Sequence, residues 1–400
     1  MDFQLTAEQA ALVKAAKDLA RREFAPRAFT WEERDEYPSE YLGVLWRHGL
    51  SGITLPEDIG GQGGTLMQAV LVIEAVAGIC PNAADCLQAL NFSGVQLLAR
   101  FGSPHLHERH LAPLLRGEGL VSVAMSEPGA GSAVSELKTT ASIRGNHVVL
   151  DGQKIFNSNG PHCTHWVVWV RFGPSSRDVG VVLVERGTPG MEIHPHRFMS
   201  GEQYAMLFFD GCRVPVENVV VRRDAFRGMM SIFNVERLGN AARSLGLGQL
   251  AFDIAVAHAK DRQQFGRRLC EFQGLQWKFA EMKLALEAAR LLLYRAAASA
   301  DAGIPSALET SLAKLACNRA GFNVANEALQ VLGGLGYSDE SRVNYIFRRT
   351  RGWMIAGGTI EQMLNRVASE VFDESFSQRG RDAGAGMTKI VDQPGQGAPA

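Results

Sequence analysis

Two groups of histidines are the first residues whose types and spacing could support chemistry, because an imidazole can bind a metal or transfer a proton. His105, His107 and His110 form one group, and His162 and His165 form the other. On a helix, positions 107 and 110 share a face that position 105 does not join, and no carboxylate completes the set. In the second group, the alternation of an expected strand sends the two side chains to different faces. We interpret both groups as structural and expect no metal site.

A glycine-rich run and a basic run suggest two further kinds of site. The run Gly333-Gly334-Leu335-Gly336 could form a dinucleotide-binding loop, but such a loop follows a strand and opens a helix. Here a long helical pattern precedes the glycines, so we interpret them as a helix stop. The run Arg348-Arg349-Thr350-Arg351 has no interleaved aromatic residues, and we interpret it as an anion-binding or interface patch rather than a nucleic-acid site.

The composition excludes several classes of protein. The chain has 400 residues, of which 46% are hydrophobic and 21% are charged, as in a typical globular protein. Lysine and arginine (41) balance aspartate and glutamate (42), so we expect neither a nucleic-acid nor a membrane partner. No apolar run approaches the roughly 20 residues of a membrane span, and the N-terminus has no apolar signal segment. The cysteines form no Cys-x-x-Cys pair, and we expect a cytoplasmic protein.

The hydrophobic period changes along the chain and predicts a helical region, then a β region. Residues 1–120 have the helical period, which begins with a capping box of Thr6 and Gln9 and includes a helix over residues 65–77. Residues 121–227 contain short β-rich runs between turns, typical of a small antiparallel sandwich or barrel. The expected strands are His147–Leu150, Trp166–Val170, Val179–Glu185 and Ala205–Asp210.

Residues 228–378 return to a long helical period and predict a bundle of helices. Two apolar faces flank the turn at 301–305, which indicates two antiparallel helices. The first face contains Leu275, Phe279, Met282, Leu286, Ala289 and Leu293. The second contains Leu308, Leu312, Leu315, Phe322, Leu329 and Leu332. Residues 379–400 are rich in glycine, proline and glutamine and are expected to form a disordered tail.

Three longer segments are more specific than the runs above. They are Met125-Ser126-Glu127-Pro128-Gly129-Ala130-Gly131-Ser132, then Gln264-Phe265-Gly266-Arg267 with Phe272-Gln273, and then Gln330-Val331-Leu332-Gly333-Gly334-Leu335-Gly336-Tyr337 with Gly358-Thr359. In this order and α–β–α setting, residues 1–375 resemble the acyl-CoA dehydrogenase family of flavoenzymes. The resemblance implies an α+β fold with an N-terminal helical domain, a central antiparallel β domain and a C-terminal four-helix bundle. It also implies a bound FAD and a homotetramer.

The resemblance assigns residues to the FAD site, between the β domain and the bundle. Near the flavin ring and pyrophosphate it implies Met125, Ser126, Gly131, Ser132, the stacking residue Phe156, and Ser158 near flavin N5. Near the adenine half, across a subunit interface, it implies Arg262, Phe272, Gln273, Gln330, Gly333 and Gly334. Thr359 and Glu361 would lie on the opposite side. The chain has Ala133 and Arg349 where the family usually has aspartate, so we expect different local ion pairing.

The family reaction needs a carboxylate base that removes the α-proton of an acyl thioester. Most members have a glutamate directly before the Gly-Thr of the third segment, where this chain has Gly357. A minority, including isovaleryl- and long-chain-type members, has the base in a Glu-Arg pair, which here is Glu236-Arg237. The resemblance therefore implies Glu236 as the base, in an acyl-CoA site with Ser132, Asn234, Arg237 and Gly357. Two alternatives remain: Glu236 could be only a helix-start acid, or Glu361 could be the base.

The activity that the resemblance implies is FAD-dependent α,β-dehydrogenation of an acyl-CoA to a 2,3-enoyl-CoA. Its electrons would pass to an electron-transferring flavoprotein. Because Gly357 leaves the volume of a glutamate side chain free, we expect a branched, cyclic or aromatic acyl group. The alternatives are an enoyl-CoA reductase, a C–S lyase or a flavin monooxygenase of the same fold. A catalytically silent flavoprotein subunit is a further alternative.

Overall fold

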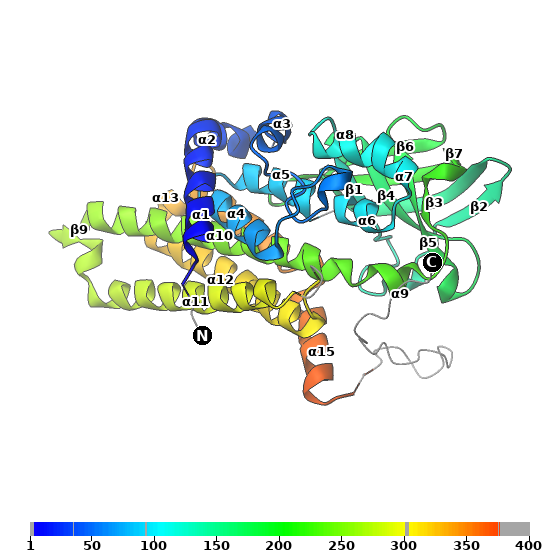
Figure 1. Cartoon of the computed structure of the whole chain (residues 1–400). Coiled ribbons are helices and arrows are strands. Elements are labelled where there is room, and N and C mark those ends of the chain that lie inside the picture. The colour runs from blue at the N-terminus through cyan, green and yellow to red at the C-terminus, as the bar shows by residue number, and fades with distance from the viewer. Residues whose placement is uncertain (1–3, 35, 93, 301–303, 375, 377–400) are drawn as a thin grey trace.

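The computed structural model describes residues 4–34, 36–92, 94–300, 304–374 and 376. Helices come first, a sheet follows, and long helices complete the chain, which confirms the expected α+β class. Figure 1 shows the N-terminal helices along one side of the long C-terminal helices, and the sheet at one end of them. The expected tail, residues 379–400, lies outside the described residues.

The N-terminal region consists mainly of short helices, two of which begin at capping boxes. Thr6 and Gln9 form the expected capping box of α1 (Ala7–Leu19), and Thr65 with Gln68 forms another at α4 (Leu66–Ala77). α4 is apolar on nearly all sides because it packs against α1, α5 (Pro81–Asn91) and α10 (Ile232–Asp261). The remaining helices here are α2 (Ala25–Arg34), α3 (Glu40–Arg47), α6 (Gly94–Phe101), α7 (Pro104–Leu106) and α8 (Ala112–Leu115), with π-helical turns η1 (Ala20–Phe24) and η3 (His107–Leu111).

The central region forms one main sheet, and the four expected strands all lie in it. In the described residues its strands follow the order β6-β7-β3-β2-β4-β5-β8, with β1 paired to β4. Most neighbours are antiparallel, whereas β1 and β2 each pair with β4 in parallel. The strands are β1 (Val121–Ala124), β2 (Thr140–Arg144), β3 (His147–Ser158), β4 (His165–Arg171), β5 (Val179–Glu185), β6 (Met191–Arg197), β7 (Gln203–Pro215) and β8 (Val219–Val221).

The sheet has a hydrophobic core on each of its faces. On β5, Val182 and Val184 belong to one core, which continues among the long helices. Val181 and Leu183 point the other way, into a core that α6, η3 and α8 cover. Because successive side chains of a strand alternate in direction, a strand buried on both faces is a continuous apolar run. This explains the unbroken apolar sequence of β5.

Long helices form the C-terminal region, as expected. The turn expected between α11 and α12 is described only from residue 304 onward. Among the described residues, no helix combines the length and the apolar character needed to cross a lipid bilayer. The helices are α9 (Ala225–Met229), α10, α11 (Gln273–Ala298), α12 (Ala307–Leu332), α13 (Gly334–Tyr337), α14 (Arg342–Trp353) and α15 (Ile360–Val371), and the hairpin of β9 (Gln263–Gln264) and β10 (Arg267–Arg268) joins α10 to α11.

The apolar face expected on α11 is confirmed, but the one expected on α12 is largely wrong. On α12 only Leu315 and Leu332 of the expected set are buried, and small residues form most of the buried surface. The reason is close helix packing: a Cβ on Gly248 of α10 would lie 2.9 Å from the Cα of Gly321. Small residues permit this approach, so α12 lies in the middle of the bundle against α10, α11, α14 and α15. Gly333 ends α12 with φ of 62°, which confirms the expected helix stop.

Candidate active site

A buried ion pair fixes the loop that follows β1, which contains the first glycine-rich segment. The Nζ of Lys154 donates to the Oε1 of Glu127 at 2.7 Å and to the carbonyl oxygen of Met125 at 3.1 Å. Glu127 also accepts from the backbone N–H groups of Lys138 and Thr139. Breaking such a buried pair typically costs about 3–5 kcal/mol. The loop at 125–132 is therefore held rigidly against β3.

Phe156 lies next to this loop in a strained backbone conformation. The N–H of Ile155 donates to the carbonyl oxygen of Ser126 at 2.9 Å, which joins the loop to the strand. Phe156 has a φ of 60°, at an irregularity in the pairing of β3 with β7. A non-glycine residue in the left-handed region costs on the order of 1–3 kcal/mol, and such residues cluster at ligand sites. Its side chain is 53% exposed, so the ring is available for stacking.

The start of α10 brings together three of the residues expected to bind the substrate. Arg237 donates from Nε to the carbonyl oxygen of Gly357 and from Nη1 to Oδ1 of Asn234, both at 3.0 Å. Asn234 in turn donates from Nδ2 to the carbonyl oxygen of Pro305 at 3.2 Å. Glu236 lies between Asn234 and Arg237 in the sequence and lines the same cavity as Gly357. The expected Glu-Arg pair and the expected glycine thus meet at one site.

One oxygen of the Glu236 carboxyl group is buried without a hydrogen-bond partner. This oxygen, Oε2, is inaccessible to solvent and makes no hydrogen bond to the described residues. Burial raises the pKa of this carboxyl to about 7, although Arg243, Gln88 and Arg237 act to lower it. Around neutral pH the group therefore exchanges a proton readily, as a general base must.

Glycine conformations and a buried lysine shape the loop opposite Glu236. Gly357 and Gly358 have φ values of 70° and 97°, which favour glycine. Lys314 is fully buried and donates from Nζ to the carbonyl oxygens of Gly358 at 2.9 Å and Trp353 at 3.1 Å. The N–H of Gly357 donates to no backbone carbonyl within the described part of the chain. This loop presents a free donor, and α12 fixes its position.

The cavity between α5, α10 and this loop is lined mainly by residues that the sequence did not single out. Asn240 and Arg243 follow Glu236 at four and seven residues, so helical periodicity could have placed them on the same face. No comparable signal marks the residues contributed by α5 and β7, because their approach to α10 is purely tertiary. The polar lining comprises Asp85, Gln88, Ser122, Ser158, Asn159, Glu202, Tyr204, Glu236, Asn240 and Arg243.

Charged residues beneath the cavity form a network that corrects one expectation. Arg349, expected in an anion-binding or interface patch, is 3% exposed and pairs with Asp85 and with Glu202, the latter at 3.0 Å. Asp85 also accepts from Arg243 at 2.7 Å. Arg349 therefore neutralises buried carboxylates and does not contribute to an anion-binding surface.

The residues expected to reach the adenine half lie at the far end of the bundle. Arg262 caps the C-terminus of α10, Phe272 caps the N-terminus of α11, and Gln330 lies near the end of α12. Figure 1 shows the β9 hairpin at the end of α10 opposite the sheet. From Glu236 to Arg262, α10 is about 39 Å long at 1.5 Å per residue. Within one chain, the residues expected near the flavin ring therefore lie far from those expected near the adenine half.

Glu361, the alternative base, has a different environment from Glu236. Thr359 caps α15 by accepting from the N–H of Gln362, and Glu361 lies exposed in the first turn of that helix. Hydrogen bonds from its own N–H and from Thr359 lower the pKa of Glu361. A carboxylate in this setting stays ionised and solvated, so the geometry favours Glu236.

Comparisons with known proteins identify the class that this fold and site define. Models of the acyl-CoA dehydrogenase N-terminal, middle and C-terminal domains match residues 6–118, 122–212 and 226–372. The chain belongs to the acyl-CoA dehydrogenase family, whose cofactor is FAD. It is an oxidoreductase of that family.

Individual relatives and solved structures match over nearly the full chain. A 3-sulfinopropanoyl-CoA desulfinase of Paraburkholderia xenovorans (strain LB400) is 34% identical, over 94% of this chain and 99% of the relative. A short-chain-specific acyl-CoA dehydrogenase of Clostridium acetobutylicum is 30% identical, over 93% and 100%. The structure of butyryl-CoA dehydrogenase from Megasphaera elsdenii has a TM-score of 0.87 at 31% identity, over 93% of this chain and 100% of that one. A glutaryl-CoA dehydrogenase bound to glutaryl-CoA has a TM-score of 0.89 at 28% identity, over 93% and 97%.

The residues of this chain fit an FAD. At Gly131, Gly333 and Gly334, an added Cβ would meet no atom within 4 Å, so open space lies beside each backbone. Such gaps let a backbone approach a cofactor closely. The exposed ring of Phe156 offers a stacking surface, and Arg262 offers a cation for a diphosphate. Because the two groups lie at opposite ends of the bundle, one chain does not place both of them around one FAD.

Proposed function

We propose that this protein dehydrogenates an acyl-CoA thioester between its α and β carbons, forming a 2,3-enoyl-CoA with Glu236 as the catalytic base. The observation that carries the proposal is the unpartnered Oε2 of Glu236, whose carboxyl has a pKa of about 7 in the cavity that Gly357 also lines. A base with a pKa near the working pH transfers protons efficiently.

Each residue around Glu236 has a separate role in the proposed reaction. FAD, when bound, supplies the acceptor for the two electrons and the β-hydrogen. Glu236 takes the α-proton onto its unpartnered Oε2. The N–H of Gly357 donates to the thioester carbonyl and stabilises the negative charge that develops there. Arg237 and Lys314 hold the carbonyl oxygens of Gly357 and Gly358, which fixes the position of the loop that presents that N–H.

Further residues would hold the cofactor in the position that this reaction needs. Phe156 stacks on the flavin ring, and Ser158 donates toward it from the end of β3. The backbone of the loop at 125–132, with Ser126 and Ser132, contacts the ring and the pyrophosphate. Backbone N–H groups and glycines suit this role because they approach phosphates closely. Thr359 and Glu361 complete the site from the start of α15.

The acyl group is proposed to be branched, cyclic or aromatic, and to carry a polar group. The volume beside Gly357 accommodates a wide acyl group, since residue 357 has no side chain. Arg243 also lines the cavity, and its Nε is buried without a partner among the described residues. A buried donor without an acceptor is costly, so an acceptor on the acyl group would stabilise the complex.

The assembly proposed is a homotetramer in which two chains share each FAD. Exposed apolar side chains on α11 support this: Trp277, Leu284 and Leu291 recur every seven residues on one face and are 63%, 64% and 50% exposed. A row of this kind is typical of a helix that packs against a partner. Phe265, at the tip of the β9 hairpin, is 94% exposed. By the family's chemistry, an electron-transferring flavoprotein would reoxidise the enzyme.

An anaerobic bleaching screen tests the dehydrogenase proposal. The FAD-loaded protein is mixed with straight, branched, cyclic, aromatic and dicarboxylic acyl-CoA thioesters, and the loss of flavin absorbance is followed. At least one thioester should bleach the flavin and yield its 2,3-enoyl-CoA. If none does so, even at saturating concentration, the dehydrogenase proposal is wrong.

A second candidate function is replacement of a sulfinate group by hydrogen at the β carbon. The desulfinase relative at 34% identity and the arginine in the cavity favour it, since a guanidinium binds sulfur oxyanions well. With water, the sulfinate would leave as sulfite and the acyl-CoA would keep a saturated chain. This reaction yields sulfite while the flavin stays oxidised, so the same assay with 3-sulfinopropanoyl-CoA separates the two functions.

A further inference from the structure

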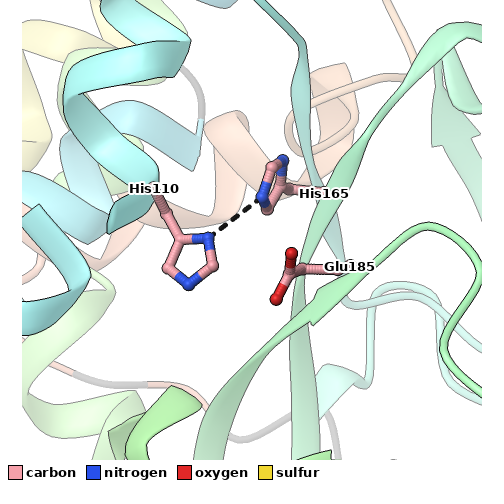
Figure 2. A group of neighbouring side chains, drawn as sticks. All are labelled: His110, His165 and Glu185. Atoms are coloured by element: carbon pink, nitrogen blue, oxygen red, sulfur yellow. Dashed lines mark hydrogen bonds between the residues drawn. The ribbon is translucent and has the colours of Figure 1, made fainter. Parts of the chain in front are cut away.

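The fold brings together one histidine from each of the two histidine groups in the sequence. Neither group alone has the spacing of a metal site. His110 belongs to η3, and His165 is the first residue of β4. Their facing nitrogens, Nδ1 of His110 and Nε2 of His165, are 3.1 Å apart. Glu185 ends β5 directly opposite His165 in the antiparallel pair. Figure 2 shows the two rings and the carboxylate around one shared space.

We propose that His110, His165 and Glu185 bind one divalent transition-metal ion, with Zn²⁺ as the ion that fits best. One donor atom from each side chain lies within 4.8 Å of the others. Two imidazoles and one carboxylate form a donor set that zinc commonly takes, with a fourth position left for water. The site is separate from the cavity that contains Glu236, whose lining includes none of the three residues.

The distances suit a zinc ion after a small side-chain movement. Zinc–nitrogen bonds of 2.0–2.1 Å in tetrahedral geometry place two ligand atoms about 3.3 Å apart. The two histidine nitrogens, at 3.1 Å, are already close to that separation. The carboxylate oxygen lies at most 4.8 Å from the two nitrogens, so it must move toward them by about 1.5 Å at most. Rotation of the half-buried Glu185 side chain is enough for this.

A chain of hydrogen bonds orients His165 for metal binding. The hydroxyl of Thr164 donates to the carbonyl oxygen of Leu120 at 3.1 Å. Because that hydroxyl has one proton, it accepts from the Nδ1–H of His165, at 2.8 Å. The lone pair of His165 is therefore on Nε2, which faces His110. Metal-binding histidines usually have such a partner on the other ring nitrogen.

His110 is buried with one ring nitrogen unpaired. It is 2% exposed, and its Nε2 makes no hydrogen bond to the described residues. Asn218 is a polar neighbour of this histidine. Without a metal, the Nδ1–H of His110 can donate to Nε2 of His165 at 3.1 Å. With its proton on Nε2 instead, on the side away from His165, His110 turns a lone pair toward the lone pair of His165. A cation between the two rings removes that repulsion.

The bound ion would tie three segments together. η3 covers one face of the sheet, and β4 and β5 are neighbouring strands of it. Leu120 and Cys163, which line the cavity with Glu236, lie close in sequence to β1 and His165. The ion would therefore stabilise this end of β4 and β5 beside the active site, without contact with the substrate.

Zinc titration of the FAD-loaded protein tests the site. The protein is stripped with EDTA, transferred to chelator-free buffer, and titrated with Zn²⁺ alone by calorimetry, with bound metal counted by elemental analysis. One Zn²⁺ per chain is expected. At a hundred times the Kd, the Tm should rise by about 3 °C for a chain of this size. Absence of saturable binding to the parent would overturn the proposal.

Matched variants assign the binding to these residues. His165→Gln should abolish binding, and Glu185→Gln should weaken it at least tenfold. Glu185→Gln keeps size at a half-buried position, so it remains informative if His165→Gln does not fold. His194→Gln is the control, because His194 forms an exposed pair with Glu192 at 3.1 Å on β6. Binding that persists in both site variants, or that is lost in the control, would show that zinc binds elsewhere.

Discussion

Arg237 donates a hydrogen bond from Nε to the carbonyl oxygen of Gly357 at 3.0 Å, across 120 residues of sequence. The bond joins the helix that presents Glu236 to the loop that presents the free N–H of Gly357. A carboxyl base and an N–H donor must lie on the two sides of one thioester to act together. The hydrogen bond between these two residues therefore sets the geometry of the proposed reaction.

Glu236→Gln should slow flavin reduction by roughly 10²- to 10⁴-fold, the usual contribution of a positioned general base. Glutamine keeps the size and much of the polarity of glutamate but cannot accept the α-proton. Rapid-mixing absorbance with a good acyl-CoA measures the rate, and the FAD spectrum should stay unchanged. Glu361→Gln tests the alternative base and should lose far less rate than Glu236→Gln. A fast Glu236→Gln with a slow Glu361→Gln would move the base to Glu361.

The pH dependence of kcat/KM should follow the raised pKa of Glu236. Only the carboxylate form accepts a proton, so activity should rise with pH through about 7 and level off above it. At pH 5, about a hundredth of the plateau should remain if this single ionisation controls the rate. The profile is measured over a range in which the protein stays folded and FAD stays bound. A plateau that extends down to pH 5 would contradict a base with this pKa.

Lys314→Met should slow flavin reduction by about 10- to 100-fold, because small misplacements of reacting groups have effects of this size. The substitution leaves the carbonyl oxygen of Gly358 without the bond from Nζ, at 2.9 Å. The loop that presents the N–H of Gly357 then loses its support from α12. Lys283→Met, at an exposed ion pair on α11, is the control. Equal rates for both variants would show that the loop is held by other contacts.

Arg262→Ala should lower the retention of FAD and shift the oligomer toward smaller species. A charge-assisted contact with a phosphate is typically worth about 1.5–3 kcal/mol. Gel filtration with light scattering reports the assembly, and the flavin-to-protein ratio after dialysis reports retention. Arg144→Ala, at an exposed position of β2, provides the comparison. If Arg262→Ala holds FAD as tightly as Arg144→Ala does, Arg262 does not contact the cofactor.

Local patterns in the sequence were enough to predict much of the fold. The capping box of α1, the strands and the seam of α11 each depend on residues close together in the chain. The prediction for α12 is wrong because helical periodicity favours its large apolar residues as the buried face. In fact Gly321 lies so close to α10 that small residues are buried instead. That choice depends on the distance between two helices, which periodicity alone does not encode.

The residues of the candidate site were likewise predictable only where they lie close together in the sequence. Glu236 and Gly357 could be found from short motifs, and helical spacing from Glu236 also leads to Arg243. Arg349 was misassigned because its partner Asp85 is 264 residues away. The pairing of His110 with His165 was missed for a similar reason, since each group was assessed on one element at a time. Local spacing therefore predicts a site best when one helix or loop supplies its residues.

The length of α10 has a consequence for mixtures of damaged subunits. If Glu236 and Arg262 serve cofactors at opposite ends of the helix, each complete site takes one residue from each of two chains. A pair made of one Glu236→Gln chain and one Arg262→Ala chain then has both defects in one of its two sites and leaves the other site intact. Two preparations that are each inactive would regain activity after their subunits exchange, which no enzyme with its whole site in one chain can do.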